Sequence, residues 1–145
     1  MIPILFAIIS GAAMSLQGVF NTKLGEKIGL WETTVLVQGI ALISALIVSF
    51  IFGKGNYREL QNTNKLYLLG GILGIIITFT VMKSISGMGA TCGIAIILVS
   101  QLLTAALINA FGLFGSEKIS FGFKEILGIA IMIVGIVEIG RASCR

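Results

Sequence analysis

Long runs without a charged residue dominate the chain. Residues 2–22 and 33–53 each form an uncharged run of 21, residues 66–82 a run of 17, and residues 84–116 a run of 33. An α-helix rises about 1.5 Å per residue, so roughly 20 apolar residues cross the ~30 Å hydrocarbon core of a bilayer. The runs lack the alternation that a β-barrel strand needs. The pattern therefore predicts an all-α integral membrane protein.

Polar residues divide these runs into about five transmembrane helices within one domain, residues 1–137. We expect the helices over residues 2–22, 31–53, 66–82, 91–114 and 121–137. The longest polar segment, residues 53–65, links the second helix to the third. The fifth helix has the weakest support, because only 12 uncharged residues follow Glu125.

The carboxyl-terminal residues do not look like part of the native coding sequence. Residues 139–145 match one reading frame of a common sequencing-adapter oligonucleotide, and the same frame supplies the last two bases of a Glu138 codon. We therefore expect residues 138–145 to be a non-native read-through tail, and we assign no function to them.

Composition supports a membrane protein and argues against several other classes. The chain is 57% hydrophobic and 11% charged, with a mean hydropathy of +1.08; soluble domains carry about 25% charged residues. The net charge of +4 is spread over short loops without interleaved aromatic residues, which argues against nucleic-acid binding. Cys92 and Cys144 indicate neither a disulfide framework nor a metal site, and no cofactor is expected.

The amino end lacks a basic leader, so we interpret it as the first transmembrane helix.

Amides inside hydrocarbon spans need partners, because lipid offers none. Gln17 and Asn21 are four residues apart and share a face of the first helix. Gln101 and Asn109 are eight residues apart on the fourth helix, about 12 Å along its axis. We interpret these four residues as the lining of a polar substrate pathway. The alternative is that they form hydrogen bonds between helices and serve only assembly.

No carboxylate lies at the middle of any secure span, so a coupling group must come from a helix end. Glu32 and Lys83 are the candidates for coupling or charge recognition; the alternatives are a favourable helix start for Glu32 and a snorkelling helix end for Lys83. The sequence contains no nucleophile with a base, no phosphate-binding loop and no metal-ligand set, so we do not expect an enzyme.

Small residues recur within the helices. Gly70 and Gly74 are four residues apart on the third predicted helix, and Gly128 and Gly135 are seven apart on the fifth. Because lipid gives helices no hydrophobic reason to associate, close backbone approach at small residues holds them together. These four glycines are therefore predicted helix-packing positions.

Positive charges give little orientation bias. With five spans, one side of the membrane carries Lys54, Arg58, Lys65, Lys118 and Lys124, and the other carries Lys23, Lys27 and Lys83. The difference in the number of positive charges between the two sides falls further if the two arginines of the suspected tail are counted. Two interpretations stay open: a small but real orientation preference, or insertion in both directions with pairing of inverted copies.

The order of several short motifs resembles the YdcZ-type family of the drug/metabolite transporter superfamily, whose members are EamA-like. The matching segments are Gln17-Gly18-Val19-Phe20-Asn21, Gly70-Gly71-Ile72-Leu73-Gly74, Gln101-Leu102 and Phe111-Gly112-Leu113-Phe114-Gly115, followed by Gly128 and Gly135. The resemblance covers residues 2–137. Where many relatives carry Asp-His, this chain has Asn109-Ala110, which removes an ionisable pair.

The resemblance implies an inverted-repeat half that pairs antiparallel with a second copy or with a paired homologous subunit. It implies a multi-pass protein of the bacterial plasma (inner) membrane. Such a protein would be a secondary transporter that exports a small organic metabolite or cation by alternating access. The alternative is a non-transporting subunit, or a half-transporter that needs a partner protein.

Overall fold

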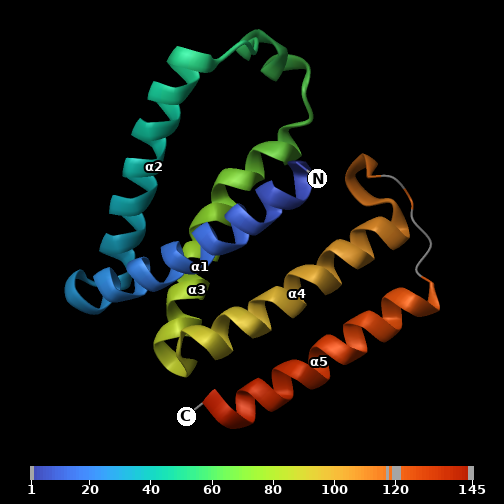
Figure 1. The fold of residues 1–145 in the computed structure, drawn as a ribbon. Coiled ribbons are helices and arrows are strands. Elements are labelled where there is room, and N and C mark those ends of the chain that lie inside the picture. Colours follow the sequence, from blue (N-terminus) through green and yellow to red (C-terminus); the bar gives the residue numbers. More distant parts are fainter. Residues whose placement is uncertain (1, 117, 119–121, 144–145) are drawn as a thin grey trace. The chain divides into compact units, whose positions relative to one another are not determined.

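The computed structural model describes residues 2–116, 118 and 122–143, and its described helices confirm the predicted all-α membrane class (Figure 1). No strand occurs among these residues. The elements are α1 (Ile2–Ile28), α2 (Leu30–Phe52), α3 (Gly70–Met88), α4 (Ala90–Phe111) and α5 (Phe123–Ser143), with short 3₁₀ helices η1 (Tyr57–Asn62), η2 (Lys65–Leu69) and η3 (Leu113–Gly115).

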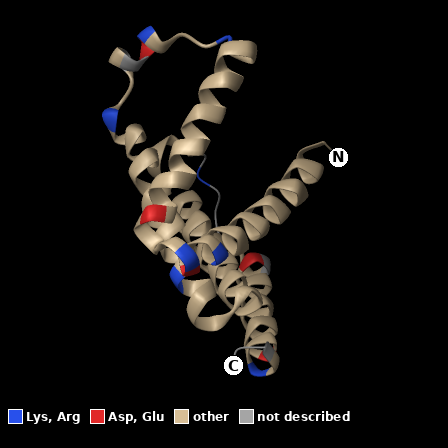
Figure 2. Ribbon diagram, turned by 90° about the vertical axis from the view of Figure 1, so that its left-hand side faces the viewer, with Lys and Arg blue, Asp and Glu red and all other residues tan. Residues whose placement is uncertain are grey.

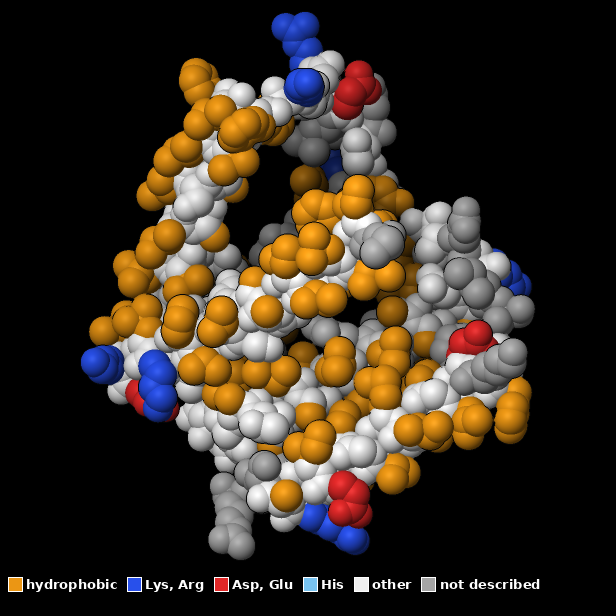
Figure 3. All heavy atoms as spheres, in the orientation of Figure 1, with side chains coloured by type: hydrophobic (Ala, Val, Ile, Leu, Met, Phe, Trp, Pro, Cys, Tyr) orange, Lys and Arg blue, Asp and Glu red, His pale blue; other side chains and the backbone are white. Residues whose placement is uncertain are grey.

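Four of the described helical segments are long and apolar enough to cross a membrane: Ile2–Ile28, Leu30–Phe52, Lys65–Met88 and Ala90–Phe111. Hydrophobic side chains cover the helices on the face shown in Figure 3. Charged residues lie in loops and toward helix ends, as the coloured ribbon of Figure 2 shows. In α5, Glu125 lies in the first turn and Arg141 in the last, so its uncharged stretch is shorter.

Helix α1 runs to Ile28, six residues beyond the predicted end at Thr22. Lysine and glutamate end the hydrocarbon span but are good helix formers, so the backbone continues as a helix. Lys23 and Glu26 also form an ion pair one turn apart, with Nζ and Oε2 separated by 2.9 Å. In the same way α3 continues past Lys83 to Met88.

Glycines with positive φ create two abrupt helix breaks. Gly29 separates α1 from α2 with φ 101° and ψ 153°, and Gly89 separates α3 from α4 with φ 81° and ψ 163°. This backbone region is essentially restricted to glycine. Each glycine N–H donates to the carbonyl four residues back, Gly25 O at 3.0 Å and Ile85 O at 2.8 Å. Each glycine therefore ends one helix and lets the next begin without an intervening loop.

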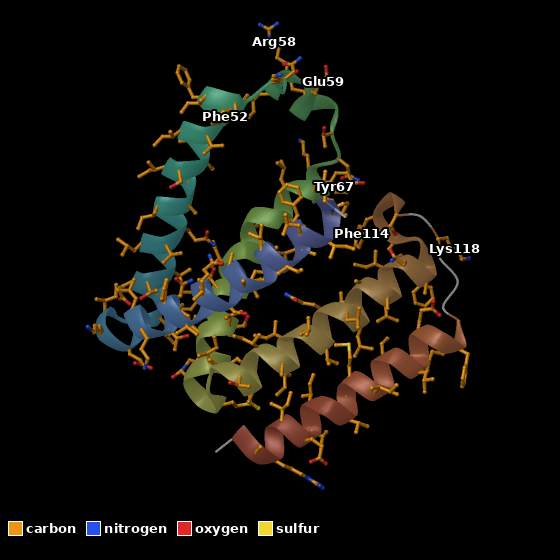
Figure 4. The ribbon with its side chains drawn as sticks, viewed as in Figure 1. Phe52, Arg58, Glu59, Tyr67, Phe114 and Lys118 are labelled. Carbon is orange, nitrogen blue, oxygen red and sulfur yellow. The ribbon has the colours of Figure 1, made fainter. Side chains whose placement is uncertain are left out.

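Other helix ends also differ from the prediction. Helix α4 stops at Phe111, three residues before the predicted end, because Gly112 takes a left-handed cap with φ 62°. Helix α3 begins at Gly70, because Asn64 first caps the 3₁₀ helix η2 by accepting a hydrogen bond from the Leu66 N–H at 3.0 Å. The predicted start of the fifth helix, position 121, lies outside the described residues. Figure 4 shows Phe52 at the end of α2 and Arg58 in the segment beyond it.

The chain forms two compact units, Met1–Lys83 and Ser84–Arg145. The first contains α1, α2 and most of α3; the second contains the end of α3, α4 and α5. Among the described residues, the buried apolar side chains are Met82, Ile85 and Cys92, and the buried polar side chains are Asn21, Thr22, Thr33 and Thr34. Helices that face lipid need little apolar core. The buried polar residues are therefore the ones that indicate where a functional site lies.

Candidate functional site

The first unit buries a polar cluster, which we define as Asn21 and Thr22 of α1 with Thr33 and Thr34 of α2. The cluster residues are between 0% and 8% exposed. The buried positions of α1 are Gly18, Asn21, Thr22 and Gly25, a spacing of three, four and seven residues that places them on one helix face. This face of α1 therefore packs against protein, although it is polar.

Gly25 lets the other helices approach this face. A Cβ atom built on Gly25 would lie 3.1 Å from Leu30 Cδ2, 3.4 Å from Met82 Sδ and 3.7 Å from Thr33 Oγ1. The glycine thus contacts the start of α2 and the buried methionine of α3. Asn21 lies one turn earlier on the same face of α1. The glycine therefore brings the Thr33 hydroxyl close to the α1 backbone.

The buried threonines differ in their hydrogen bonding. Thr22 Oγ1 donates to Gly18 O and Thr34 Oγ1 donates to Leu30 O, each at 2.8 Å within its own helix. The Thr33 side chain is 0% exposed, and its Oγ1 has no hydrogen-bond partner in the described part of the chain. A buried hydroxyl without a partner costs about 1–3 kcal/mol, so we interpret Thr33 Oγ1 as unused hydrogen-bonding capacity within the cluster.

Asn21 strengthens this interpretation. It is 8% exposed, and its amide makes no hydrogen bond to any residue that the structure describes. An amide offers two N–H donors and one oxygen acceptor, and a threonine hydroxyl can donate or accept. Together they can bind an uncharged polar group or a water molecule, but they supply neither a nucleophile nor a charge.

Gln17 does not join the polar cluster. The sequence predicted that Gln17 and Asn21 share one face, yet Gln17 is exposed while Asn21 is buried. Each helical residue rotates by about 100°, so Gln17 is turned away from the neighbouring buried Gly18. Its role in a substrate pathway stays a prediction.

Glu32 and Lys83 are both exposed. Among the described residues no ion pair joins them or involves either one. The Glu32 carboxylate lies close to Gly29, at the amino end of α2 where the helix dipole favours a negative charge. The coupling role of both residues stays a prediction.

The second unit holds the other two predicted pathway residues, so the structure does not assemble the four amides in one unit. On α4, Gln101 is exposed and Asn109 is half-buried. Asn109 lines a cavity of about 340 Å³ between α4 and α5, together with Glu125 and Gly128. Glu125 accepts a hydrogen bond from the Gly122 N–H at 3.0 Å. This cavity is mostly apolar and open.

Cys92 is buried and disulfide-bonded, which differs from the sequence interpretation that gave the cysteines no bonding role. Cys144 lies outside the described residues.

The predicted packing glycines have different surroundings. A Cβ on Gly74 would lie 3.3 Å from Gln38 Nε2, so this glycine faces α2. At Gly70, Gly128 and Gly135 an added Cβ would meet nothing within 4 Å among the described residues. Their packing role stays a prediction.

The family model described as "Putative inner membrane exporter, YdcZ" matches residues 2–138. The chain belongs to this YdcZ exporter family. No curated protein and no solved structure matched it. Membership supports a transport role in the inner membrane, and the apolar helices agree with a multi-pass arrangement. The family match indicates a transporter rather than an enzyme.

Sequence reasoning missed most of the polar cluster in this YdcZ-family chain. Asn21 was selected because an amide inside a span is conspicuous, whereas threonine is common in membrane helices and usually bonds to its own helix. The available signal was the spacing of Gly18, Asn21, Thr22 and Gly25, which marks a small and polar face directly before the Gly29 break.

Proposed function

We propose that the chain is a secondary transporter that exports a small organic metabolite or cation across the inner membrane, with the polar cluster as part of its binding site. The observation that carries the proposal is the fully buried Thr33 hydroxyl, which has no partner among the described residues. A solute hydroxyl, carbonyl or amine reaching this atom would remove the cost of burying it. Family membership supports transport as the purpose of that contact.

We further propose that the working unit is an antiparallel dimer. Gln17 and Gln101 lie within apolar helices and are exposed on the surface of the single chain. Polar side chains within a membrane face protein or a water-filled cavity, because lipid cannot satisfy them. A second copy, or a paired homologous subunit, would cover them and complete a pathway that works by alternating access.

Reconstituted protein tests transport directly. Proteoliposomes loaded with a labelled solute are screened for counterflow by an unlabelled one, with and without a pH gradient. Solute-dependent exchange above protein-free liposomes is the expected result. Inert liposomes containing folded dimer would favour a non-transporting subunit, and exchange that appears only after a homologous partner is added would identify a half-transporter.

Gln17→Leu is expected to lower flux by about fivefold while the dimer persists on size-exclusion chromatography. The lost hydrogen bond is worth about 1 kcal/mol, which corresponds to a factor of about five. A mutant with normal flux would remove Gln17 from the pathway. A mutant that dissociates would show that Gln17 serves assembly instead.

Dual orientation has its own test. A tag at the carboxyl end is probed with a membrane-impermeant reagent in intact and opened cells. We expect about half of the tags to react in intact cells, because the positive charges are nearly balanced. Reaction from one side alone would end the proposal of a dual-topology homodimer and leave pairing with a second subunit.

A further inference from the structure

Trp31 and Glu32 lie beside each other on the outer surface of α2, next to the buried Thr33. Together with Val35 and Leu36 they line a shallow depression of about 390 Å³ that is widely open at the surface. The lining combines one indole, one carboxylate and two branched aliphatic side chains. No lysine or arginine that the structure describes lines it.

The indole is held in place on one side only. Trp31 stacks on Phe79 of α3, with ring centroids 4.5 Å apart and an angle of 17° between the planes. The Trp31 side chain is nevertheless 61% exposed, so ring surface remains free for a ligand. The face of an indole attracts cations through the ring quadrupole, more strongly than the ring of tyrosine or phenylalanine.

Glu32 differs from the other described carboxylates. Glu26 pairs with Lys23, Glu125 accepts a backbone N–H, Glu138 pairs with Arg141, and Glu59 also has a partner. Within the described residues, Glu32 has neither an ion pair nor a hydrogen bond. Its negative charge is therefore available to an external cation.

We propose that Trp31 and Glu32 form a recognition site for an apolar organic cation, such as a quaternary ammonium compound. The cationic group would contact the carboxylate and the indole face, and the apolar part would lie against Val35 and Leu36. The claim that this cation is the exported solute rests on the proposed function, whereas the claim that it binds does not.

Trp31 is the single tryptophan of the chain, so the tryptophan fluorescence of the protein reports on this site directly. Purified protein in nanodiscs of zwitterionic lipid is titrated with benzyltrimethylammonium and, separately, with its neutral isostere neopentylbenzene. We expect the cation to quench the fluorescence of Trp31 saturably. The isostere should change the fluorescence only as far as its partitioning into the lipid does. Equal responses to both probes would overturn the proposal.

Glu32→Gln is expected to weaken cation binding about tenfold, because it removes the charge and keeps the shape. The matched control is Glu125→Gln: Glu125 is also the third residue of an exposed helix start, but it already has a partner. The control should bind like the wild type. Unchanged binding in Glu32→Gln, or weaker binding only in Glu125→Gln, would overturn the site.

Two further variants keep the test decisive. If Glu32→Gln fails to yield a monodisperse dimer, Glu32→Asp retains the charge on a shorter arm and should bind severalfold more weakly than wild type; unchanged affinity would overturn the proposal. Trp31→Phe, measured by calorimetry, should lose about threefold in affinity for the cation.

Binding and flux measurements together separate the two claims. Cation binding without cation flux would refute export of the cation but not the site. Flux of another solute without cation binding would refute the site alone.

Discussion

Thr33→Val is expected to lower export by about tenfold and at the same time to raise the melting temperature of the purified protein. Valine keeps the branched shape and removes the hydroxyl. The hydroxyl is fully buried and has no partner in the described part of the chain, so its removal relieves a desolvation cost of about 1–3 kcal/mol. If a solute normally bonds to it, the same change removes that bond.

Thr34→Val is the matched control. Thr34 is the next residue on α2 and is 3% exposed, but its hydroxyl donates to Leu30 O at 2.8 Å. Its removal should leave flux within about twofold of wild type and should not raise stability, because a satisfied intrahelical bond is lost. Flux is measured in proteoliposomes, and stability by the fraction of protein that stays monodisperse on size-exclusion chromatography after heating.

The two measurements separate the possible roles of Thr33. Higher stability with normal flux would mean that the hydroxyl does not meet the solute. Lower stability would mean that the hydroxyl has a structural partner, such as a bound water, and would remove the observation on which the proposed function rests. Only the combination of lower flux and higher stability supports a solute contact at Thr33.

The sequence predicted the helices well because a bilayer imposes a simple condition. A span needs about 20 uncharged residues, and the runs at residues 2–22 and 33–53 meet this condition without reference to tertiary structure. Helix ends were less predictable, since charge ends the hydrocarbon span but not the helix. Thus α1 passes Lys23 and stops only at Gly29, where φ is 101°.

The candidate site was predicted only in part, because burial depends on which side of a helix meets its neighbours. Asn21 and Gln17 have similar side chains on the same helix, yet one is buried and the other exposed. Whether Thr33 bonds to its own helix, as Thr34 does, depends on a side-chain rotamer that no sequence pattern specifies.

Gly29→Ala is expected to destabilise the protein by about 1–3 kcal/mol, because alanine must adopt φ and ψ values that are essentially restricted to glycine. The added Cβ would also displace the Glu32 carboxylate, although that flexible side chain can move. The measurement is the fraction of protein that stays monodisperse on size-exclusion chromatography after heating. Gly89→Ala, at the equivalent break between α3 and α4, should show a loss of similar size.

The control for this change is Gly39→Ala. Gly39 lies inside α2, where an added Cβ meets nothing within 4 Å, so alanine should stabilise the helix by about 0.5–1 kcal/mol. The same chemical change therefore has opposite effects on stability at two positions ten residues apart, one at the helix break and one inside α2. Gly29→Ala should also lower flux, because the Gly29 carbonyl accepts the Thr33 N–H at 3.1 Å and so links the break to the polar cluster. Equal stability of Gly29→Ala and wild type would show that α1 and α2 do not turn at Gly29, and the contact of Gly25 with Thr33 would then lose its structural basis.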